Sequence, residues 1–257
     1  MIFEKYIPGQ PKTEAYFAFC DMMKDFDLGV SYADMMRVRI TGALAGECHD
    51  VYYIAHEDGK GIGRHWNGWG KHPNAIGNWG GFFVNEAYRG KGVGGKLLRL
   101  WWEDFQASED RPLCFCCTAG SKDLTQLYNR FGFVPAIEGT DRGPLYMPVG
   151  DSPATFREFY NVYYKPTDRI IRKSATVEYR HEIDCLLRFA LKDQGIPFGI
   201  DDVSSMEAAL LYWPERAGIL FSDDGRTVGW TFDQKMQVYP QYSSLAAEQF
   251  PDFKQVL

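Results

Sequence analysis

The sequence lacks the features that would take a chain to or across a membrane. No uninterrupted apolar run approaches the ~18 residues that a transmembrane helix requires. The N-terminal segment MIFEKYIPGQPK contains no apolar core of the kind found in a secretory signal. These absences predict a soluble protein that is made and kept in the cytoplasm and has no membrane partner.

An excess of positive charge is also missing. The chain has 28 Lys and Arg residues against 34 Asp and Glu residues, which gives a formal net charge of −6. Nucleic-acid-binding proteins normally present a basic surface, so we expect no nucleic-acid partner. The acidic balance is compatible with a cationic substrate, although ordinary solubility explains it more simply.

The six cysteines follow no disulfide or metal-ligand spacing. Cys114, Cys116 and Cys117 crowd into the segment PLCFCCTAG, but no second CxxC pair and no cluster of histidines completes a tetrahedral site. We therefore expect no bound metal, and we interpret these cysteines as small apolar side chains of a buried strand.

Apolar residues, in contrast, are plentiful enough for a packed core, at 45% of the chain with 16% aromatic residues. Residue patterns predict strands at 2–7, 50–56, 79–84 and 113–118, two helices within 13–45 separated near Gly29, helices at 94–105 and 122–131, and a strand pair ending near 149. The segment 61–79, rich in Gly, Trp, His and Asn, predicts a strand followed by a long irregular loop. This order indicates an α/β domain, of the α+β type, over residues 1–150.

The remaining residues predict a smaller α/β unit. Residues 151–175 contain Pro153 and Pro166 and are interpreted as a connecting segment. Residues 176–257 predict strands at 176–179 and 217–222 and helices at 181–192 and 203–212. The segment IAHEDGKGIG at 54–63 aligns without gaps with LFSDDGRTVG at 220–229, and short helical segments precede both. This echo favours a degenerate half-repeat, although a shared strand–turn–strand pattern also explains it.

The segment VNEAYRGKGVGGKLL at 84–98 has four glycines beside one arginine and two lysines, a composition typical of a phosphate-binding loop. Gly90 to Lys96 fits GxxxxGK, but the next residue is Leu97, which cannot bind magnesium as the required Ser or Thr does. Gly90, Gly92 and Gly95 have the dinucleotide spacing, but the following strand ends without the acidic residue that the motif needs. Both nucleotide interpretations are therefore weak.

A third pattern, [RQ]-x-x-G-x-[GA] between a strand and a helix, matches Arg89–Gly94 at every defined position. The segment LYNRFGF at 127–133 matches a second pattern, L-Y-x-x-x-G-F. With both motifs in this order, the chain over about residues 1–150 resembles the GNAT superfamily of acyl-CoA-dependent N-acetyltransferases. The resemblance implies a mixed central sheet flanked by helices, with acetyl-CoA as co-substrate and an amine as acceptor. It implies a cofactor site at Phe83, Val84, Arg89, Gly90, Lys91, Gly92, Val93, Gly94, Ser121 and Tyr128.

In this resemblance, Tyr128 occupies the position of the general acid near the sulfur of CoA. Ser121 stands where many members carry an asparagine, which leaves its role open. The strand before the loop lacks the glutamate that many relatives use as base, and Glu86 lies too near the phosphates. His65 and His72 are the candidate bases, placed in the expected aromatic loop, where Trp66, Trp69 and Trp79 either line an acceptor pocket or pack in the core.

Two functions follow from these residues. One is an N-acetyltransferase acting on a small-molecule or protein amine, and the other is a non-catalytic acyl-CoA-binding or scaffold protein with a degenerate GNAT fold. The C-terminal unit is compatible with covering the acceptor site, forming a homodimer or holding a partner, and the sequence does not choose among these.

Overall fold

The computed structural model describes residues 1–24, 30–196 and 203–256. It divides into two compact units, the first comprising residues 1–71 and 77–111 and the second residues 72–76 and 112–257. Within the described residues, no helix has the length and apolar character needed to cross a membrane.

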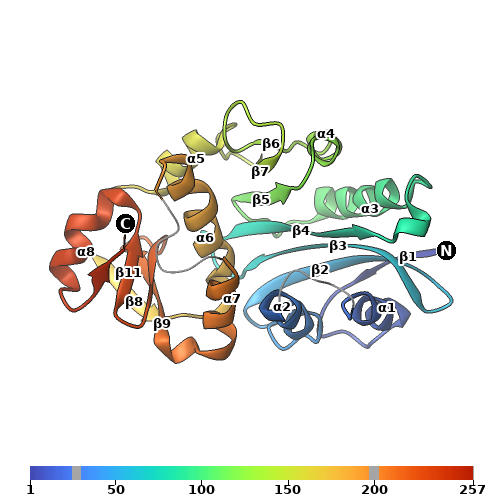
Figure 1. Ribbon diagram of the computed structural model, residues 1–257, viewed down its shortest axis with the longest axis horizontal. Helices are drawn as coiled ribbons and strands as arrows, with labels where there is room; N and C mark the ends of the chain where they lie inside the picture. The colour runs from blue at the N-terminus through green and yellow to red at the C-terminus, as the bar shows by residue number, and fades with distance from the viewer. Residues whose placement is uncertain (25–29, 197–202, 257) are drawn as a thin grey trace. The chain divides into compact units, whose positions relative to one another are not determined.

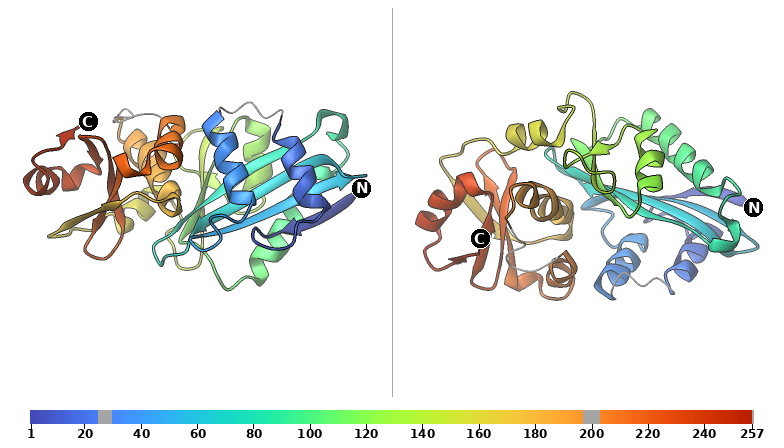
Figure 2. Two further views of the ribbon diagram at one scale, coloured as in Figure 1. Left: turned by 90° about the horizontal axis from the view of Figure 1, so that it is seen from below. Right: turned by 45° about the horizontal axis from the view of Figure 1, so that its top comes forward.

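The first unit is a sheet of four antiparallel strands between two layers of helices. Its elements are β1 (Ile2–Tyr6), α1 (Glu14–Met22), α2 (Val30–Ile40), β2 (Cys48–Glu57), β3 (Lys60–Gly70), β4 (Ile76–Val84) and α3 (Val93–Ala107). The strands lie in the order β1-β2-β3-β4, each antiparallel to its neighbour. Helices α1 and α2 cover one face and α3 covers the other (Figure 1), and the view from below shows α1 and α2 lying across the strands (Figure 2). The two expected helices are confirmed, and the expected break at Gly29 lies outside the described residues.

The alternation of side chains along β2 and β3 explains why both faces are covered. Tyr52 pairs with Trp66 and belongs to the core beneath α1 and α2. The next pair, Tyr53 and His65, points to the opposite face, where Trp101 of α3 packs against His65 with ring centroids 5.8 Å apart. Because successive residues of a strand face opposite sides, two apolar faces require two helical layers.

An ion pair is buried beneath α2. The Arg39 Nη1 donates to both carboxylate oxygens of Asp50 at 2.8 and 3.1 Å, and the Trp66 indole N–H donates to the same carboxylate at 2.8 Å. The side chains of Arg39 and Asp50 are 0% and 3% exposed. The pair therefore connects α2 to β2 and β3 in a setting where neither charge reaches water.

The expected long loop within residues 61–79 is wrong, because this segment forms β3, a short connection and β4. Its glycines serve close packing. A Cβ at Gly61 would meet Met22 Cγ at 2.4 Å, and one at Gly68 would meet Asp50 Oδ1 at 2.5 Å. The aromatic residues between them suit a strand that is buried on both faces.

The second unit begins with a three-stranded antiparallel sheet in the order β5-β7-β6. Its elements are β5 (Cys114–Ala119), α4 (Lys122–Asn129), β6 (Val134–Pro135), β7 (Gly143–Pro148) and α5 (Phe156–Tyr163). Cys114, Cys116 and Cys117 are buried on β5, as expected. Burial raises the pKa of each thiol, which keeps these cysteines protonated and unreactive.

A five-stranded sheet in the order β12-β11-β10-β9-β8 completes the second unit. Its elements are β8 (Ile170–Ser174), α6 (Arg180–Cys185) continued by a π-helical turn (Leu186–Leu191), α7 (Val203–Tyr212), β9 (Ala217–Ser222), β10 (Thr227–Phe232), β11 (Lys235–Val238), α8 (Ser243–Gln249) and β12 (Lys254–Gln255). Figure 1 shows α8 on one face of this sheet and α6 and α7 on the other. The expected α/β architecture of helix-flanked sheets, with a further C-terminal α/β part, is confirmed.

One expectation for this region is wrong, because the predicted strand at 176–179 is a 3₁₀ turn at Val177–Tyr179. The connecting segment 151–175 contains α5 and β8. Helix α5 begins with a capping box, in which the Thr155 side chain accepts from the Glu158 N–H and the Glu158 carboxylate accepts from the Thr155 N–H. A Thr-x-x-Glu sequence is a start signal for a helix, so the residues themselves carried this information.

The order of elements in the C-terminal part repeats that of the first unit. The run β8-α6-α7-β9-β10-β11-α8 has the order of β1-α1-α2-β2-β3-β4-α3, and the pairs β8–β9, β9–β10 and β10–β11 are antiparallel like β1–β2, β2–β3 and β3–β4. The aligned sequences are the β2–β3 and β9–β10 hairpins, whose turns contain Gly59 and Gly225 at φ 73° and 79°. The topology therefore agrees with a half-repeat.

Candidate functional site

The glycine-rich segment forms the turn from β4 into α3. After β4, a 3₁₀ turn at Glu86–Tyr88 begins at Asn85, whose side chain accepts from the Ala87 N–H. Gly90 and Gly92 then adopt φ values of 75° and 79°. This left-handed region is strained for residues with a Cβ, so glycine is required for the turn itself.

Helix α3 starts without a side-chain cap. Its N-cap residue is Gly92, which has no side chain to accept from the first turn, and the first intrahelical bond is Lys96 N–H to Gly92 O at 3.1 Å. The N–H groups of Val93, Gly94 and Gly95 come before this first bond and therefore have no acceptor within the helix. Together with the positive end of the helix dipole, such groups form an anion-binding site.

The glycines of this turn serve different purposes. No atom lies within 4 Å of a Cβ built at Gly90, Gly92 or Gly95, so this side of the loop is open. A Cβ at Gly94 would instead meet the Phe82 ring at 2.8 Å and Val84 Cγ2 at 3.5 Å. Gly94 thus allows α3 to pack closely on β4.

The cationic residues of the loop are exposed at its rim. Arg89 Nε donates to the Val84 carbonyl at 3.1 Å, which ties the loop back to the end of β4. The Lys91 ammonium lies 5.3 Å from the centroid of the Tyr88 ring. Glu86 opens the 3₁₀ turn at an exposed position. An anion at the helix terminus would therefore meet two cationic side chains close by in sequence.

A β-bulge interrupts β4 just before the loop, and the sequence prediction did not include it. Arg64 pairs with Phe83 and Trp66 with Gly80, so His65 alone opposes both Gly81 and Phe82. Gly81 has a φ of 59°, and its carbonyl accepts from Arg64 Nε at 3.1 Å. The Gly-Gly pair inside a predicted strand was the available signal, because glycine within a strand often marks a bulge.

Beyond the bulge, the register assigns directions to the backbone groups of β4. Asn85 N–H donates to Ile62 O at 2.8 Å, so Asn85 and Ile62 form a hydrogen-bonded pair. By the alternation of antiparallel ladders, the next pair, Val84 and Gly63, is non-hydrogen-bonded and Val84 turns its N–H and C=O away from β3. Phe83 turns its backbone groups toward β3. The register thus favours Val84 over Phe83 as a ligand-binding backbone.

His65 does not lie in a loop, contrary to expectation, but is fully buried on β3. Its ring packs against Trp79, Tyr53 and Trp101 at centroid distances of 4.4, 5.8 and 5.8 Å. Burial lowers the pKa of His65 to about 3, and the nearby Gly80 backbone carbonyl, which favours the protonated ring, opposes this only in part. An enclosed and neutral imidazole has no access to an acceptor amine.

The other candidate base, His72, belongs to the second unit. Its Nε2 lies 3.3 Å from Oε1 of the buried Glu182, which also accepts from the Ile76 N–H at 2.7 Å. The ring of His72 packs on Tyr179 with centroids 4.7 Å apart and lines a cavity of about 270 Å³. A carboxylate behind a partly exposed imidazole is the arrangement that orients a histidine base.

The second predicted motif also lies in the second unit, on α4. The Ser121 hydroxyl caps this helix by accepting from the Leu124 N–H at 3.3 Å. Tyr128 is 5% exposed, and burial together with Cys117 raises the pKa of its hydroxyl, so the phenol stays protonated at neutral pH. Tyr128 can therefore serve as a hydrogen-bond donor.

The three tryptophans of the expected aromatic loop are all buried, with exposures of 1% for Trp66, 6% for Trp69 and 0% for Trp79. Trp66 belongs to the core beneath α1 and α2, and Trp79 packs on His65. Trp69 lines a cavity of about 410 Å³ in the first unit.

In the described part of the chain, no three His, Cys, Asp or Glu side chains lie together in a way that could hold a metal ion.

Known proteins provide an independent comparison. No curated protein matches the chain. Among solved structures, similarity is found to Escherichia coli ElaA at 17% identity and a TM-score of 0.43, covering 57% of this chain and 99% of that one. A GNAT-family acetyltransferase from Streptococcus pneumoniae has 20% identity and a TM-score of 0.40, with 57% and 100% covered. An acyl-CoA N-acyltransferase from Pseudomonas aeruginosa has 15% identity and a TM-score of 0.40, with 57% and 98% covered.

A family comparison locates the match within the chain. Residues 48–135 match the family model of the acetyltransferase (GNAT) domain. The matched segment runs from β2 to β6 and includes the bulge, the glycine-rich turn, α3 and α4. The resemblance indicated by the two sequence motifs is thereby confirmed by the match to a GNAT acetyltransferase domain at residues 48–135.

Proposed function

We propose that this protein is an acetyl-CoA-dependent N-acetyltransferase that moves an acetyl group to a primary amine by direct attack in a ternary complex. The observation that carries the proposal is the start of α3, where two left-handed glycines lead into a helix whose first N–H groups have no side-chain cap. The open space at Gly90, Gly92 and Gly95 fits a ligand phosphate that approaches the backbone.

The chain supplies binding groups for the pyrophosphate of CoA. The N–H groups of Val93, Gly94 and Gly95 donate to phosphate oxygens, and Arg89 and Lys91 add positive charge around them. The Arg89 contact with the Val84 carbonyl keeps that side chain near the loop. Acetyl-CoA supplies the thioester whose acetyl group is transferred.

Two groups are proposed to act on the thioester. The Val84 N–H, directed away from β3, donates to the carbonyl oxygen and stabilises the negative charge that develops there. Tyr128 donates a hydrogen bond to the departing sulfur. Because burial raises the pKa of Tyr128 above its ordinary ~10 whereas a thiol ionises near ~8.5, full proton transfer to the thiolate is unfavourable. Tyr128 thus stabilises the leaving thiolate mainly as a donor.

The acceptor amine must lose a proton before it can attack. A lysine-like amine with a pKa of ~10.4 is neutral only about 0.04% of the time at pH 7. His72, oriented by Glu182, is the proposed base, and water-mediated deprotonation is the alternative. His65 is excluded from this role by its burial. The net charge of −6 favours a cationic acceptor over a nucleic-acid partner.

The proposal is tested by incubating the protein and acetyl-CoA with a broad panel of amines and peptides. Acetyl transfer is measured as the release of free CoA. The Tyr128→Phe variant is expected to lower kcat about 100-fold while binding acetyl-CoA normally. Gly92→Val is expected to abolish acetyl-CoA binding, whereas Gly195→Val introduces a similar backbone strain, at φ 73° instead of 79° and with no neighbouring atom within 4 Å of its Cβ, and should leave binding intact.

The alternative is a non-catalytic acyl-CoA-binding or scaffold protein. It is favoured by the C-terminal half-repeat, in which residues 239–243 replace the glycine-rich turn with a 3₁₀ segment that contains no glycine. Binding of acetyl-CoA without acetylation of any amine in the panel would support this alternative. Turnover that is sensitive to Tyr128→Phe would exclude it.

A further inference from the structure

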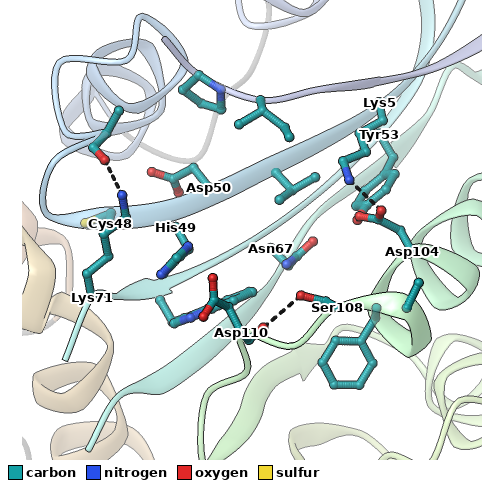
Figure 3. A pocket seen from close by; sticks show the side chains of 17 residues that line it. Lys5, Cys48, His49, Asp50, Tyr53, Asn67, Lys71, Asp104, Ser108 and Asp110 are labelled. Carbon is teal, nitrogen blue, oxygen red and sulfur yellow. Dashed lines mark hydrogen bonds and ion pairs between the residues drawn. The ribbon is translucent and has the colours of Figure 1, made fainter. Parts of the chain in front are cut away.

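We propose that the first unit has a second ligand site, which binds a small organic cation with N–H donors at the C-terminal end of α3. The site is a cavity of about 410 Å³ whose lining includes His49, Asn67, Trp69, Asp104, Ser108 and Asp110 (Figure 3). This volume lies in the range of small-molecule sites, about 300–1,000 Å³. With 15 residues at ~1.5 Å each, α3 separates this cavity from the glycine-rich turn by about 20 Å.

Asn67 is the main indication that the cavity is built for a ligand. The residue is 2% exposed, lines the cavity, and its amide oxygen is buried without a hydrogen-bond partner in the described part of the chain. A buried polar group without a partner destabilises the fold, because it has lost its hydrogen bonds to water. A ligand that donates an N–H to Asn67 would restore the missing bond.

The cavity also offers unpaired negative charge. Among the described residues, no hydrogen bond or ion pair reaches the Asp110 carboxylate, and neighbouring Arg111 donates to the carbonyls of Ser108 and Gln106 at 2.8 and 3.0 Å. The two lysines that line the cavity are engaged elsewhere. Lys5 pairs with Asp104, and Lys71 donates to the Ala45 carbonyl at 2.6 Å. Lys71 keeps its positive charge in this bond, and the carboxylate of Asp110 remains as a charged acceptor for a ligand.

An aromatic wall completes the site. The ring of His49 stacks on Trp69 with centroids 5.2 Å apart and an interplanar angle of 25°. Burial, followed by the charge of Lys71, lowers the pKa of His49, so its ring is neutral at pH 7 and keeps one acceptor nitrogen. Acceptors at Asn67, His49 and Asp110 beside aromatic faces suit an ammonium or guanidinium group.

Nuclear magnetic resonance of the ¹⁵N-labelled full chain, without acetyl-CoA, tests this site independently of acetyl transfer. The probes are butylammonium, butylguanidinium and butyrate, each at matched ionic strength. We expect saturable shifts of the Asn67 side-chain amide and the Trp69 indole with one or both cations, and none with butyrate. The two cationic arms distinguish an ammonium from a guanidinium ligand.

Matched variants test whether the Asp110 carboxylate contributes to binding of the cation. Asp110→Asn should weaken binding of the cation about tenfold or more, because a charged acceptor is lost. Glu109→Gln removes the neighbouring exposed carboxylate, which does not line the cavity, and should change binding less than twofold. Asn67→Leu should also weaken binding, and if this variant fails to fold, Asp110→Asn at its exposed position decides. Absence of saturation at about 10 mM cation, equal shifts with butyrate, or equal effects of Asp110→Asn and Glu109→Gln would overturn the proposal.

Discussion

Replacing Gly94 and Gly95 singly by alanine tests how closely α3 packs on β4. Both glycines lie in the first turn of the same helix, where alanine is favoured over glycine by about 1 kcal/mol. A Cβ at Gly95 meets no atom within 4 Å, so Gly95→Ala should stabilise the protein by about 0.5–1 kcal/mol. A Cβ at Gly94 meets the Phe82 ring at 2.8 Å, and such overpacking typically costs about 1–3 kcal/mol.

The difference between the two variants isolates this contact, because the helix-propensity contribution is common to both. We expect Gly94→Ala to be less stable than Gly95→Ala by about 1–3 kcal/mol in urea-induced unfolding. Gly94→Ala combined with Phe82→Leu, which shortens the opposing ring, should recover part of the loss. Equal stabilisation by both single substitutions would refute the close approach of α3 and β4 and, with it, the geometry assigned to the turn.

Three further substitutions test other parts of the structure. Asp50→Asn leaves the buried Arg39 without its counter-charge and should lower the free energy of unfolding by about 3–5 kcal/mol in chemical denaturation. Thr155→Ala removes the capping box of α5 and should cost about 1 kcal/mol in the same assay; no change would contradict the cap. The pKa of His65 is about 3 when folded and ~6.5 when unfolded, so the unfolded state binds more protons between these values and stability falls as pH falls. As the pH falls through this window, the free energy of unfolding of the wild type should decrease by up to about 1.4 kcal/mol more per pH unit than that of His65→Leu. Parallel curves of unfolding free energy against pH would contradict the burial of a neutral ring.

Local sequence signals predicted the elements that lie next to the glycine-rich turn. The four-residue spacing of Leu97, Trp101 and Phe105 placed a helix at 94–105, and the structure has α3 at Val93–Ala107 with all three residues buried. The strand–turn–strand pattern of the segments at 54–63 and 220–229 was also visible in the sequence, because an Asp-Gly turn depends on two residues alone. Such features need no knowledge of the tertiary packing.

Features that depend on tertiary packing were missed. His65 was assigned to a loop because its neighbours Gly61, Gly63, Gly68 and Gly70 suggested irregular structure, whereas Gly61 and Gly68 allow Met22 and Asp50 to approach β3 closely. The bulge at Gly81 was missed because Gly80 and Gly81 were read only as part of a strand. In both cases the neighbouring atoms, which come from distant parts of the sequence, determine why glycine is present.

The candidate site was likewise predictable only in part. Its loop was identified from the motif Arg89–Gly94, but the roles of individual glycines were not, since only the structure distinguishes the open Gly92 from the packed Gly94. The cavity around Asn67 had no sequence signal, because its lining comes from β1, β2, β3 and the end of α3. Sites assembled from several elements are visible only once the fold is known.

The central claim is that the turn before α3 binds the pyrophosphate of coenzyme A. The most direct measurement is thermal unfolding of the wild-type protein with CoA, with pantetheine, which lacks the pyrophosphate, and with ATP and NAD at the same concentrations. The account predicts that CoA raises the melting temperature, that pantetheine raises it much less, and that Gly92→Val removes the CoA effect. Equal stabilisation by pantetheine and CoA, or stabilisation by ATP alone, would contradict it.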